Sequence, residues 1–167
     1  MKQAVMTAPG QIEIHDVSIP TPGPGEVLLE IQRIGVCGSD IHVYHGKHPY
    51  TSYPVVQGHE FSATVKDIGA GVIGLAQGAK VTSMPQIVCG ECAPCKRGDY
   101  HICDHLKVQG FQAPGCAQEF WVTRADSIIL LPENFSFEQG ALVEPLSVAV
   151  HAVSKAGPIR GKNVAVM

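Results

Sequence analysis

Four cysteines near the middle of the chain have the type and spacing of zinc ligands. They form the pattern C-x2-C-x2-C-x7-C at Cys89, Cys92, Cys95 and Cys103, with glycine and proline between them. Structural zinc takes four ligands in a tetrahedron, and closely spaced thiolates on one loop can supply all of them. Disulfides and free thiols are the alternatives, but cysteines at three-residue intervals are poorly placed to pair with one another. The spacing predicts a structural zinc site with no open position.

A second set of potential ligands precedes this quartet. Cys37 ends a long predicted strand, and His59-Glu60 follows a loop and enters the next strand. A thiolate, an imidazole and a carboxylate are all zinc ligands, and three protein ligands with one open position define a catalytic site. Each residue alone is weak evidence of a metal site, because a lone cysteine is usually a small buried hydrophobe. In the same chain as the quartet, the set favours a second metal site.

Residues 69–74 match the pattern G-x-G-x-x-G after a predicted strand. In a dinucleotide-binding fold this pattern opens a helix, whose N-terminus holds the pyrophosphate. Here Gly78 interrupts any helix before it can form. A glycine-rich turn between two strands is therefore the favoured interpretation.

Length and composition limit the remaining functions. The chain has 167 residues and a net charge of −3, which offers no basic surface to nucleic acid. No apolar run approaches the length of a membrane span, and no basic start followed by an apolar stretch marks a signal peptide. We expect a cytoplasmic protein without nucleic-acid or membrane partners. In that setting, six cysteines and eight histidines favour metal over disulfides.

The elements that must position these ligands are short strands in the first two thirds of the chain. Glycine and proline, 18 and 12 residues, separate segments of alternating apolar residues. Such spacing is typical of a sandwich or barrel-like β domain. The predicted strands are Lys2–Thr7, Gln11–Val17, Glu26–Val36, Glu60–Ile68, Lys80–Ser83, Ala117–Thr123 and Ser127–Leu131.

The last third predicts helices. Residues 136–142 and 144–156 are rich in Ala, Leu, Val and Glu, and Pro145 fits the first turn of the second helix. Residues 162–167 then have the composition of a buried strand.

Taken together, these motifs resemble the N-terminal, GroES-like catalytic domain of the zinc-dependent medium-chain alcohol dehydrogenases. The resemblance spans essentially the whole chain and rests on residues 35–42, 58–60 and 142–152 and on the cysteine quartet. Residues 142–152 are most similar to the sorbitol (polyol) and threonine dehydrogenase branch. In that segment Glu144 stands where liver-type alcohol dehydrogenases carry a cysteine.

The resemblance implies a mainly β fold with some helix, a barrel-type GroES-like catalytic domain over residues 1–156. Residues 157–167 would begin a Rossmann nucleotide-binding domain, of which the chain contains the first strand only. The fold would then be truncated at that strand.

Two zinc ions per chain are implied. Cys37, His59 and Glu60 would hold the catalytic zinc, with water or a substrate oxygen in the fourth position, and the quartet would hold the structural zinc. Glu144 would lie beside the catalytic zinc, either as an exchangeable ligand or as a hydrogen-bond partner of its water.

Ser39 and His42 are implied to relay a proton from the substrate hydroxyl to solvent. If residues 38–46 begin as a helical turn, these two side chains share a face. An exposed imidazole has a suitable pKa for the last step of such a relay. A carboxylate at Glu144 could accept a hydrogen bond from a second substrate hydroxyl, which favours a vicinal diol or polyol.

The implied reaction is oxidation of a secondary alcohol, such as a polyol, vicinal diol or threonine-like compound. Hydride would pass to NAD or NADP in the full-length protein, which is expected to be a homodimer or homotetramer. The isolated chain is expected to be inactive. The alternative is a stand-alone zinc-binding structural or interaction module of the same fold, with only the quartet filled.

Other residues receive less specific interpretations. Cys116 is expected to be a buried free thiol, and Trp121 to lie in the core. Tyr44, Tyr50 and Phe111 are candidates for lining a substrate cleft. The histidines expected to be solvated or hydrogen-bonded, and not ligands, are His15, His45, His48, His101, His105 and His151.

Overall fold

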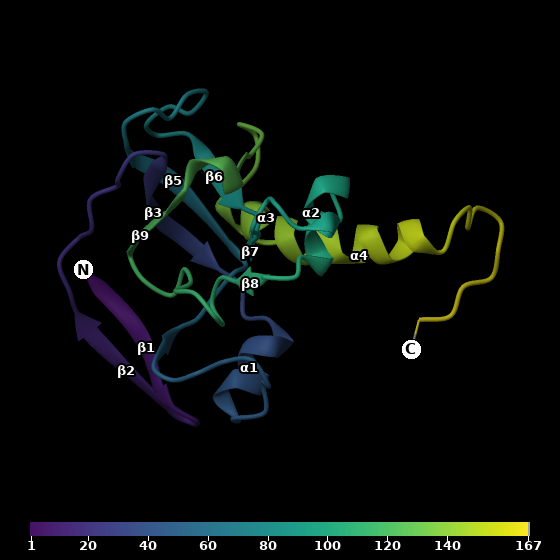
Figure 1. Cartoon of the computed structure of the whole chain (residues 1–167), viewed down its shortest axis with the longest axis horizontal. Coiled ribbons are helices and arrows are strands. Elements are labelled where there is room, and N and C mark those ends of the chain that lie inside the picture. Colours follow the sequence, from purple (N-terminus) through teal and green to yellow (C-terminus); the bar gives the residue numbers. More distant parts are fainter. Residues whose placement is uncertain (167) are drawn as a thin grey trace.

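Three antiparallel sheets form the body of the structure, a computed structural model that describes residues 1–166 (Figure 1). Their orders are β2-β1-β4, β10-β6-β5-β3-β9 and β7-β8. The strands are β1 (Lys2–Ala8), β2 (Gln11–Asp16), β3 (Glu26–Ile34), β4 (Val55–Val56), β5 (Phe61–Ile68), β6 (Lys80–Ser83), β7 (Gln86–Ile87), β8 (Lys107–Val108), β9 (Phe120–Arg124) and β10 (Ile128–Leu130).

The core lies against the five-stranded sheet. Val27, Leu28 and Leu29 of β3 are all buried, so this part of the strand is covered on both faces of the sheet. Phe61 of β5 meets Trp121 of β9 edge to face, with ring centroids 5.4 Å apart. Burial of each such side chain stabilises the fold by about 1.5–3 kcal/mol. The predicted core position of Trp121 is confirmed, and Cys116 is a buried free thiol in the same cluster.

Backbone hydrogen bonds join the first sheet to the second. The amide of Ala4 donates to the carbonyl of Ala117 (2.9 Å), and the amide of Glu119 donates to the carbonyl of Lys2 (3.0 Å). The carbonyl of Glu119 in turn accepts from Ile31 in β3 (2.9 Å). The segment before β9 therefore bridges both sheets, and the predicted mainly β, barrel-type architecture is confirmed.

Four α-helices accompany the sheets of the described residues: α1 (Gly38–Tyr44), α2 (Ala93–Arg97), α3 (Phe137–Ala141) and α4 (Val143–Lys155). Ser136 caps α3 in a capping box, in which Gln139 N donates to Ser136 Oγ (3.2 Å) and Ser136 N donates to Gln139 Oε1 (2.8 Å). Both predicted C-terminal helices are present, with Pro145 in the first turn of α4. None of the described helices is long and apolar enough to cross a membrane.

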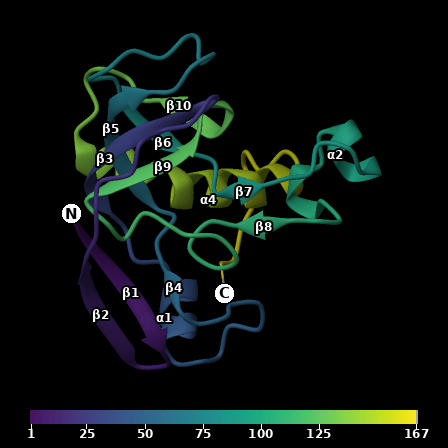
Figure 2. The ribbon, with the colours of Figure 1, turned by 60° about the vertical axis from the view of Figure 1, so that its left-hand side comes forward.

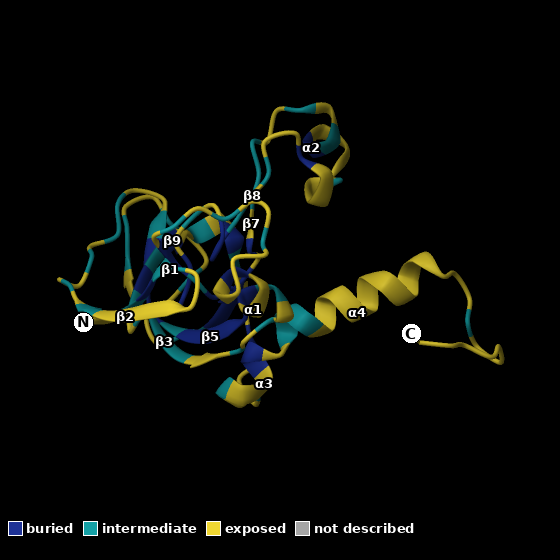
Figure 3. Ribbon diagram, turned by 90° about the horizontal axis from the view of Figure 1, so that it is seen from below, coloured by how far each residue is buried: buried dark blue, intermediate teal, exposed yellow. Residues whose placement is uncertain are grey.

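Helix α4 projects from the body and is exposed along most of its length (Figure 3). Its exposed side chains include Leu146, Val148, Val150 and Val153. The strand predicted after α4 is not present over residues 163–166, and Met167 lies outside the described residues. A strand needs a neighbour for its backbone hydrogen bonds, and no described strand runs beside these residues. The prediction was wrong for this part of the chain.

The cysteine quartet lies on a separate projection. Strands β7 and β8 leave the body as a narrow pair, and α2 lies at the far end of the excursion (Figure 2). This metal lobe, residues 88–106, has few apolar side chains of its own to bury.

Candidate metal centres

The four cysteines of the metal lobe surround one point. Cys89 follows β7, Cys92 caps the start of α2, Cys95 lies within α2, and Cys103 ends a 3-10 helix (Tyr100–Ile102). The sulfur atoms of Cys89 and Cys103 are 3.6 Å apart, and that of Cys92 is 3.9 Å from Cys103. A tetrahedron with Zn–S bonds of about 2.3 Å has edges of about 3.8 Å. The spacing therefore fits a shared metal ion, and all six cysteines are free thiols.

Backbone amides prepare this cluster for negative charge. The amides of Cys89 and His105 both donate to the sulfur of Cys103, at 3.4 Å each. A backbone hydrogen bond from Asp104 lowers the pKa of Cys92 to about 6, whereas burial raises the pKa of Cys95 to about 12. A cation bound among the sulfurs would favour the thiolate form of all four.

The second predicted ligand set also comes together. One ligand atom from each of Cys37, His59 and Glu60 lies within 4.8 Å of the other two. The end of β3 brings them together, because the amide of Gly35 donates to the carbonyl of Glu60 at 2.7 Å. Cys37 is the N-cap of α1, and Glu60 directly precedes β5.

Two glycines make this approach possible. A Cβ atom on Gly35 would lie 2.3 Å from Oε2 and 2.9 Å from Cβ of Glu60. Gly58 has a φ of +94°, and a Cβ there would meet the sulfur of Cys116 at 2.8 Å. Only glycine fits both positions, and Gly58 directly precedes the ligand His59.

Asp40 also lies at this site, a role that was not predicted from the sequence. Its carboxylate accepts the amide of Cys37 at 3.0 Å and the side-chain amide of Gln57 at 3.3 Å. Its Oδ1 also lies 3.9 Å from Nδ1 of His59, a buried atom with no hydrogen-bond partner among the described residues. A carboxylate behind a histidine orients the ring and raises its basicity toward a metal on the other nitrogen.

The charges around the second cluster fit a cation. Asp40 and Glu60 are both buried, and neither pairs with a lysine or arginine of the described residues. Burying carboxylates without a compensating positive charge is costly. The thiol, imidazole and carboxylate donors are all suited to zinc, and a divalent cation held by Cys37, His59 and Glu60 would supply the missing charge.

The other predicted catalytic residues lie on α1 and α4. Ser39 and His42 lie on α1, Ser39 half-buried and His42 exposed. Glu144, half-buried in the first turn of α4, is not among the three mutually close donors. Burial raises the pKa of Glu144, and the nearby His59 partly offsets that rise.

Aromatic rings form a wall beside the cluster. The ring centroids of Phe111 and His59 are 5.1 Å apart. His48 stacks on Phe111, with ring centroids 4.5 Å apart. His48 is hydrogen-bonded, as predicted, but its place in this wall was not foreseen. Phe111 and Tyr50 also line a groove of about 650 Å³ between β1 and the loop before β4, and no predicted metal ligand lines that groove.

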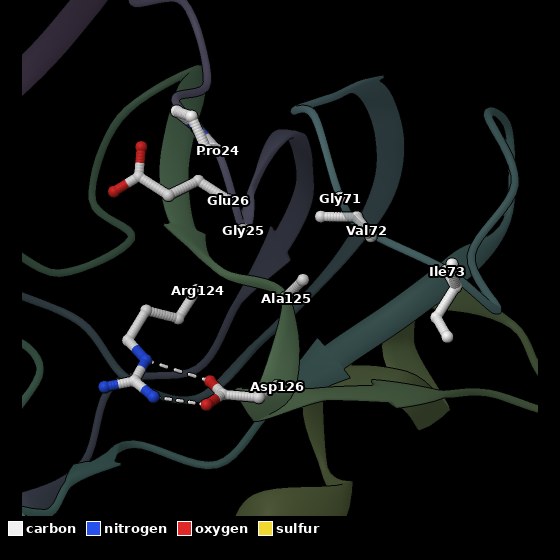
Figure 4. Close-up of a pocket in the computed structure, with 9 residues that line it drawn as sticks. All are labelled: Pro24, Gly25, Glu26, Gly71, Val72, Ile73, Arg124, Ala125 and Asp126. Carbon is white, nitrogen blue, oxygen red and sulfur yellow. Dashed lines mark hydrogen bonds and ion pairs between the residues drawn. The ribbon is translucent and has the colours of Figure 1, made fainter.

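A hollow of about 540 Å³ adjoins the glycine-rich loop of residues 69–74 (Figure 4). The next element after that loop is strand β6 and not a helix, which supports the turn interpretation. The guanidinium of Arg124, which lines the hollow, is engaged in a two-bond ion pair with Asp126. A paired arginine and the adjacent Glu26 do not favour a phosphate group.

Comparison with known protein families identifies the fold. Residues 23–133 match the alcohol dehydrogenase GroES-like domain. The chain belongs to this family. The alcohol dehydrogenase match includes both metal clusters, and Glu144 lies beyond it.

Alcohol and polyol dehydrogenases are among the relatives. The chain is 42% identical over 157 residues to 2-dehydro-3-deoxy-L-galactonate 5-dehydrogenase of Pseudoalteromonas atlantica, covering 93% of the chain and 45% of that protein. It is 37% identical to sorbitol dehydrogenase of Halalkalibacterium halodurans, covering 99% of the chain and 49% of the relative. The resemblance to the sorbitol branch of the zinc-dependent dehydrogenases is confirmed, and the chain spans about half the length of these relatives.

A solved structure agrees with the fold. The alcohol dehydrogenase rspB of Escherichia coli CFT073, complexed with NADH, superposes with a TM-score of 0.88 at 35% identity. The alignment covers 95% of this chain and 46% of that one.

Proposed function

We propose that this chain is the zinc-binding catalytic part of a dehydrogenase that oxidises a secondary alcohol, such as a polyol, vicinal diol or threonine-like compound, with NAD or NADP. The observation that carries the proposal is the buried cluster of thiol, imidazole and carboxylate donors at Cys37, His59 and Glu60. Two buried carboxylates without a lysine or arginine partner support a divalent cation at this point.

Two zinc ions would bind in different ways. Cys37, His59 and Glu60 would hold one ion and leave a position open, whereas the quartet would enclose the other completely. The chemistry that zinc supplies in an open site is Lewis-acid polarisation of an alcohol oxygen, which lowers the pKa of the hydroxyl. The closed quartet would stabilise the metal lobe.

The proton and hydride of the alcohol would leave by separate routes. Ser39 would accept the hydroxyl proton and pass it to His42, which is exposed and can release it to water. The hydride on the same carbon would pass to the nicotinamide, so the alcohol becomes a carbonyl compound and NAD(P)⁺ becomes NAD(P)H. Positions 39 and 42 are one helical turn apart on α1, which supports this order.

Glu144 would act on the substrate side of the cluster. It is half-buried, and its pKa responds to His59 and Glu60. We propose that it either exchanges as a metal ligand or accepts a hydrogen bond from the zinc-bound water. A carboxylate there could also accept a hydrogen bond from a second substrate hydroxyl, which favours polyols over simple alcohols.

The nucleotide would be bound by a Rossmann domain that begins at residues 157–167. The exposed apolar side chains of α4 and the greater length of the relatives support a further packed domain. On this proposal the isolated chain is inactive, and the complete enzyme is a cytoplasmic homodimer or homotetramer. Free cysteines fit a reducing compartment.

An assay of the protein expressed from the complete reading frame tests the proposal. Xylitol, sorbitol, 2,3-butanediol and threonine are offered with NAD⁺ and with NADP⁺, and reduced nucleotide is measured. We expect the wild type to oxidise at least one of these four substrates, and we expect Cys37→Ser to have lost that activity. Turnover that survives in Cys37→Ser would contradict the proposal, as would NADH formation by the isolated chain.

A further inference from the structure

His48 is held unusually firmly for a loop histidine. It lies between α1 and β4, and its Nδ1 is 2.7 Å from the hydroxyl oxygen of Thr51. Its ring stacks nearly parallel on Phe111, with an interplanar angle of 14°, and meets Tyr50 edge to face. One hydrogen bond and two ring contacts therefore fix both the plane and the rotation of this imidazole.

The same contacts connect His48 to the metal cluster. Phe111 packs on His48 and also contacts the ring of His59, one of the predicted ligands. His42 of the predicted proton relay and the buried Asp40 are both close enough to influence the charge of His48. His48 is thus one side chain removed from a predicted metal ligand.

One polar atom of this ring is left unused. Within the described residues, Nε2 of His48 makes no hydrogen bond, whereas Nδ1 is bonded to Thr51. Burial, with a smaller contribution from His42, lowers the pKa of His48 and so favours the neutral form of the ring, whereas Asp40 acts in the opposite direction. A neutral imidazole presents Nε2 as a donor or an acceptor, depending on which way the Thr51 hydroxyl turns.

A hydroxyl group is the ligand that suits this atom in either form. It can donate to Nε2 or accept from it, whereas a phosphate or carboxylate only accepts and is bound best by a cation. Lys47 lies next to His48 in the chain but is exposed, and the carboxylate of Asp40 is buried beside the loop. The surroundings therefore favour a neutral polyhydroxylated compound over an anionic one.

We propose that His48 contacts the substrate and forms a hydrogen bond, through Nε2, with a hydroxyl other than the one that is oxidised. The proposal rests on the proposed function and narrows its substrate class to uncharged polyols. His48 would determine specificity, while the groups that move the proton and hydride remain those already named.

Kinetics of the protein from the complete reading frame test this assignment. The substrates are xylitol or sorbitol, whichever the wild type oxidises faster, and 2-butanol, which has no second hydroxyl. His48→Phe retains a ring to stack on Phe111 but removes both nitrogens. We expect kcat/KM for the polyol to fall about 3- to 10-fold, mainly through KM, and that for 2-butanol to remain nearly unchanged.

Two further variants guard against a folding defect. Thr51→Val leaves the imidazole but removes its anchor, and should reduce polyol kcat/KM by a smaller factor in the same direction. His45→Phe replaces an exposed histidine of the same loop and should leave kcat/KM unchanged for both alcohols. Zinc content is measured for every variant to establish that the site is intact. Equal losses of kcat/KM for both alcohols in His48→Phe, or no loss of kcat/KM for the polyol, would overturn the proposal.

A binding measurement separates this inference from the proposed function. In the zinc-loaded protein, the imidazole NMR signals of His48, assigned by their absence in His48→Phe, should shift when xylitol is added. Addition of 2-butanol should leave them in place. A shift without any turnover would leave the His48 contact standing and contradict the dehydrogenase proposal. Turnover without a shift would overturn the His48 contact.

Discussion

The carboxylate of Asp40 lies 3.9 Å from Nδ1 of His59, and both side chains are buried. Asp40 is the third residue of α1, whereas His59 directly precedes Glu60 and β5, so the pair links two separate parts of the chain. The arrangement places negative charge behind the imidazole.

Replacement of Asp40 by Asn should weaken metal binding at the three-donor cluster. The amide keeps most of the shape but removes the charge that favours a metal on His59. We expect the affinity for zinc at this site to fall about 10- to 100-fold, as measured by competition with a chromophoric chelator. The control is Asp16→Asn, an exposed position paired with Lys2. An unchanged affinity in Asp40→Asn would show that the carboxylate has no such role.

Substitution of Gly35 by Ala should destabilise the protein and displace Glu60. The added methyl group would clash with the Glu60 side chain, and such overpacking typically destabilises a protein by about 1–3 kcal/mol. Gly38→Ala is a matched control, because nothing lies within 4 Å of a Cβ at that position. Urea unfolding and zinc content measure the two effects. Equal stability of the two variants would contradict this account of the β3–β5 approach.

Loss of the quartet metal should loosen the metal lobe but not the sheets. Cys95→Ser removes one of four ligands, and the lobe has little apolar core to hold it without metal. We expect rapid cleavage by trypsin at Lys96 or Arg97, while the five-stranded sheet remains protected. Cys116→Ala, a cysteine outside both clusters, serves as the control. A lobe that resists trypsin in Cys95→Ser would indicate that metal is not what orders it.

The stability of the protein should fall in mild acid, partly because of His48. Burial, then the charge of His42, lowers the pKa of His48 in the folded state below 6.5, its value in the unfolded chain. The unfolded state then binds more protons between those two values. The contribution of His48 to the free energy of unfolding is therefore fully present above pH 6.5 and decreases as the pH falls through this interval.

Urea unfolding at about pH 5 and about pH 7.5 measures this loss. His48→Phe should show a smaller difference between the two pH values than the wild type, because it lacks the titrating group. His45→Phe is the comparison variant, because His45 is not among the groups that shift the pKa of His48. An identical pH dependence in wild type and His48→Phe would rule out this contribution.

Much of the fold could be predicted from local patterns. Alternating apolar residues predicted β2 and β3 to within two residues of their observed ends, and β6 was predicted over its observed range. The two-residue strands β4, β7 and β8 carry too little sequence for such a pattern. β4 exists because it pairs with β1, some fifty residues earlier, and that pairing is a tertiary event.

The candidate site was predictable where chemistry dictates residue type. Cys37, His59 and Glu60 were predicted as one ligand set, and the structure brings them together. Asp40 was not identified, because a carboxylate beside a known ligand motif carries no sign of burial or of facing a histidine nineteen positions later. Phe111 was a candidate for lining a cleft, but its stacking on His48 depends on two loops that only the folded chain brings into contact.

The central claim is that Cys37, His59 and Glu60 form a second zinc site, independent of the cysteine quartet. Zinc per chain, measured by elemental analysis after dialysis, tests it most directly in the wild type and in Cys37→Ser. The account predicts about two zinc ions in the wild type and about one in Cys37→Ser, with the quartet still filled. One zinc ion in both proteins would contradict it, and would leave a module in which the quartet alone binds metal.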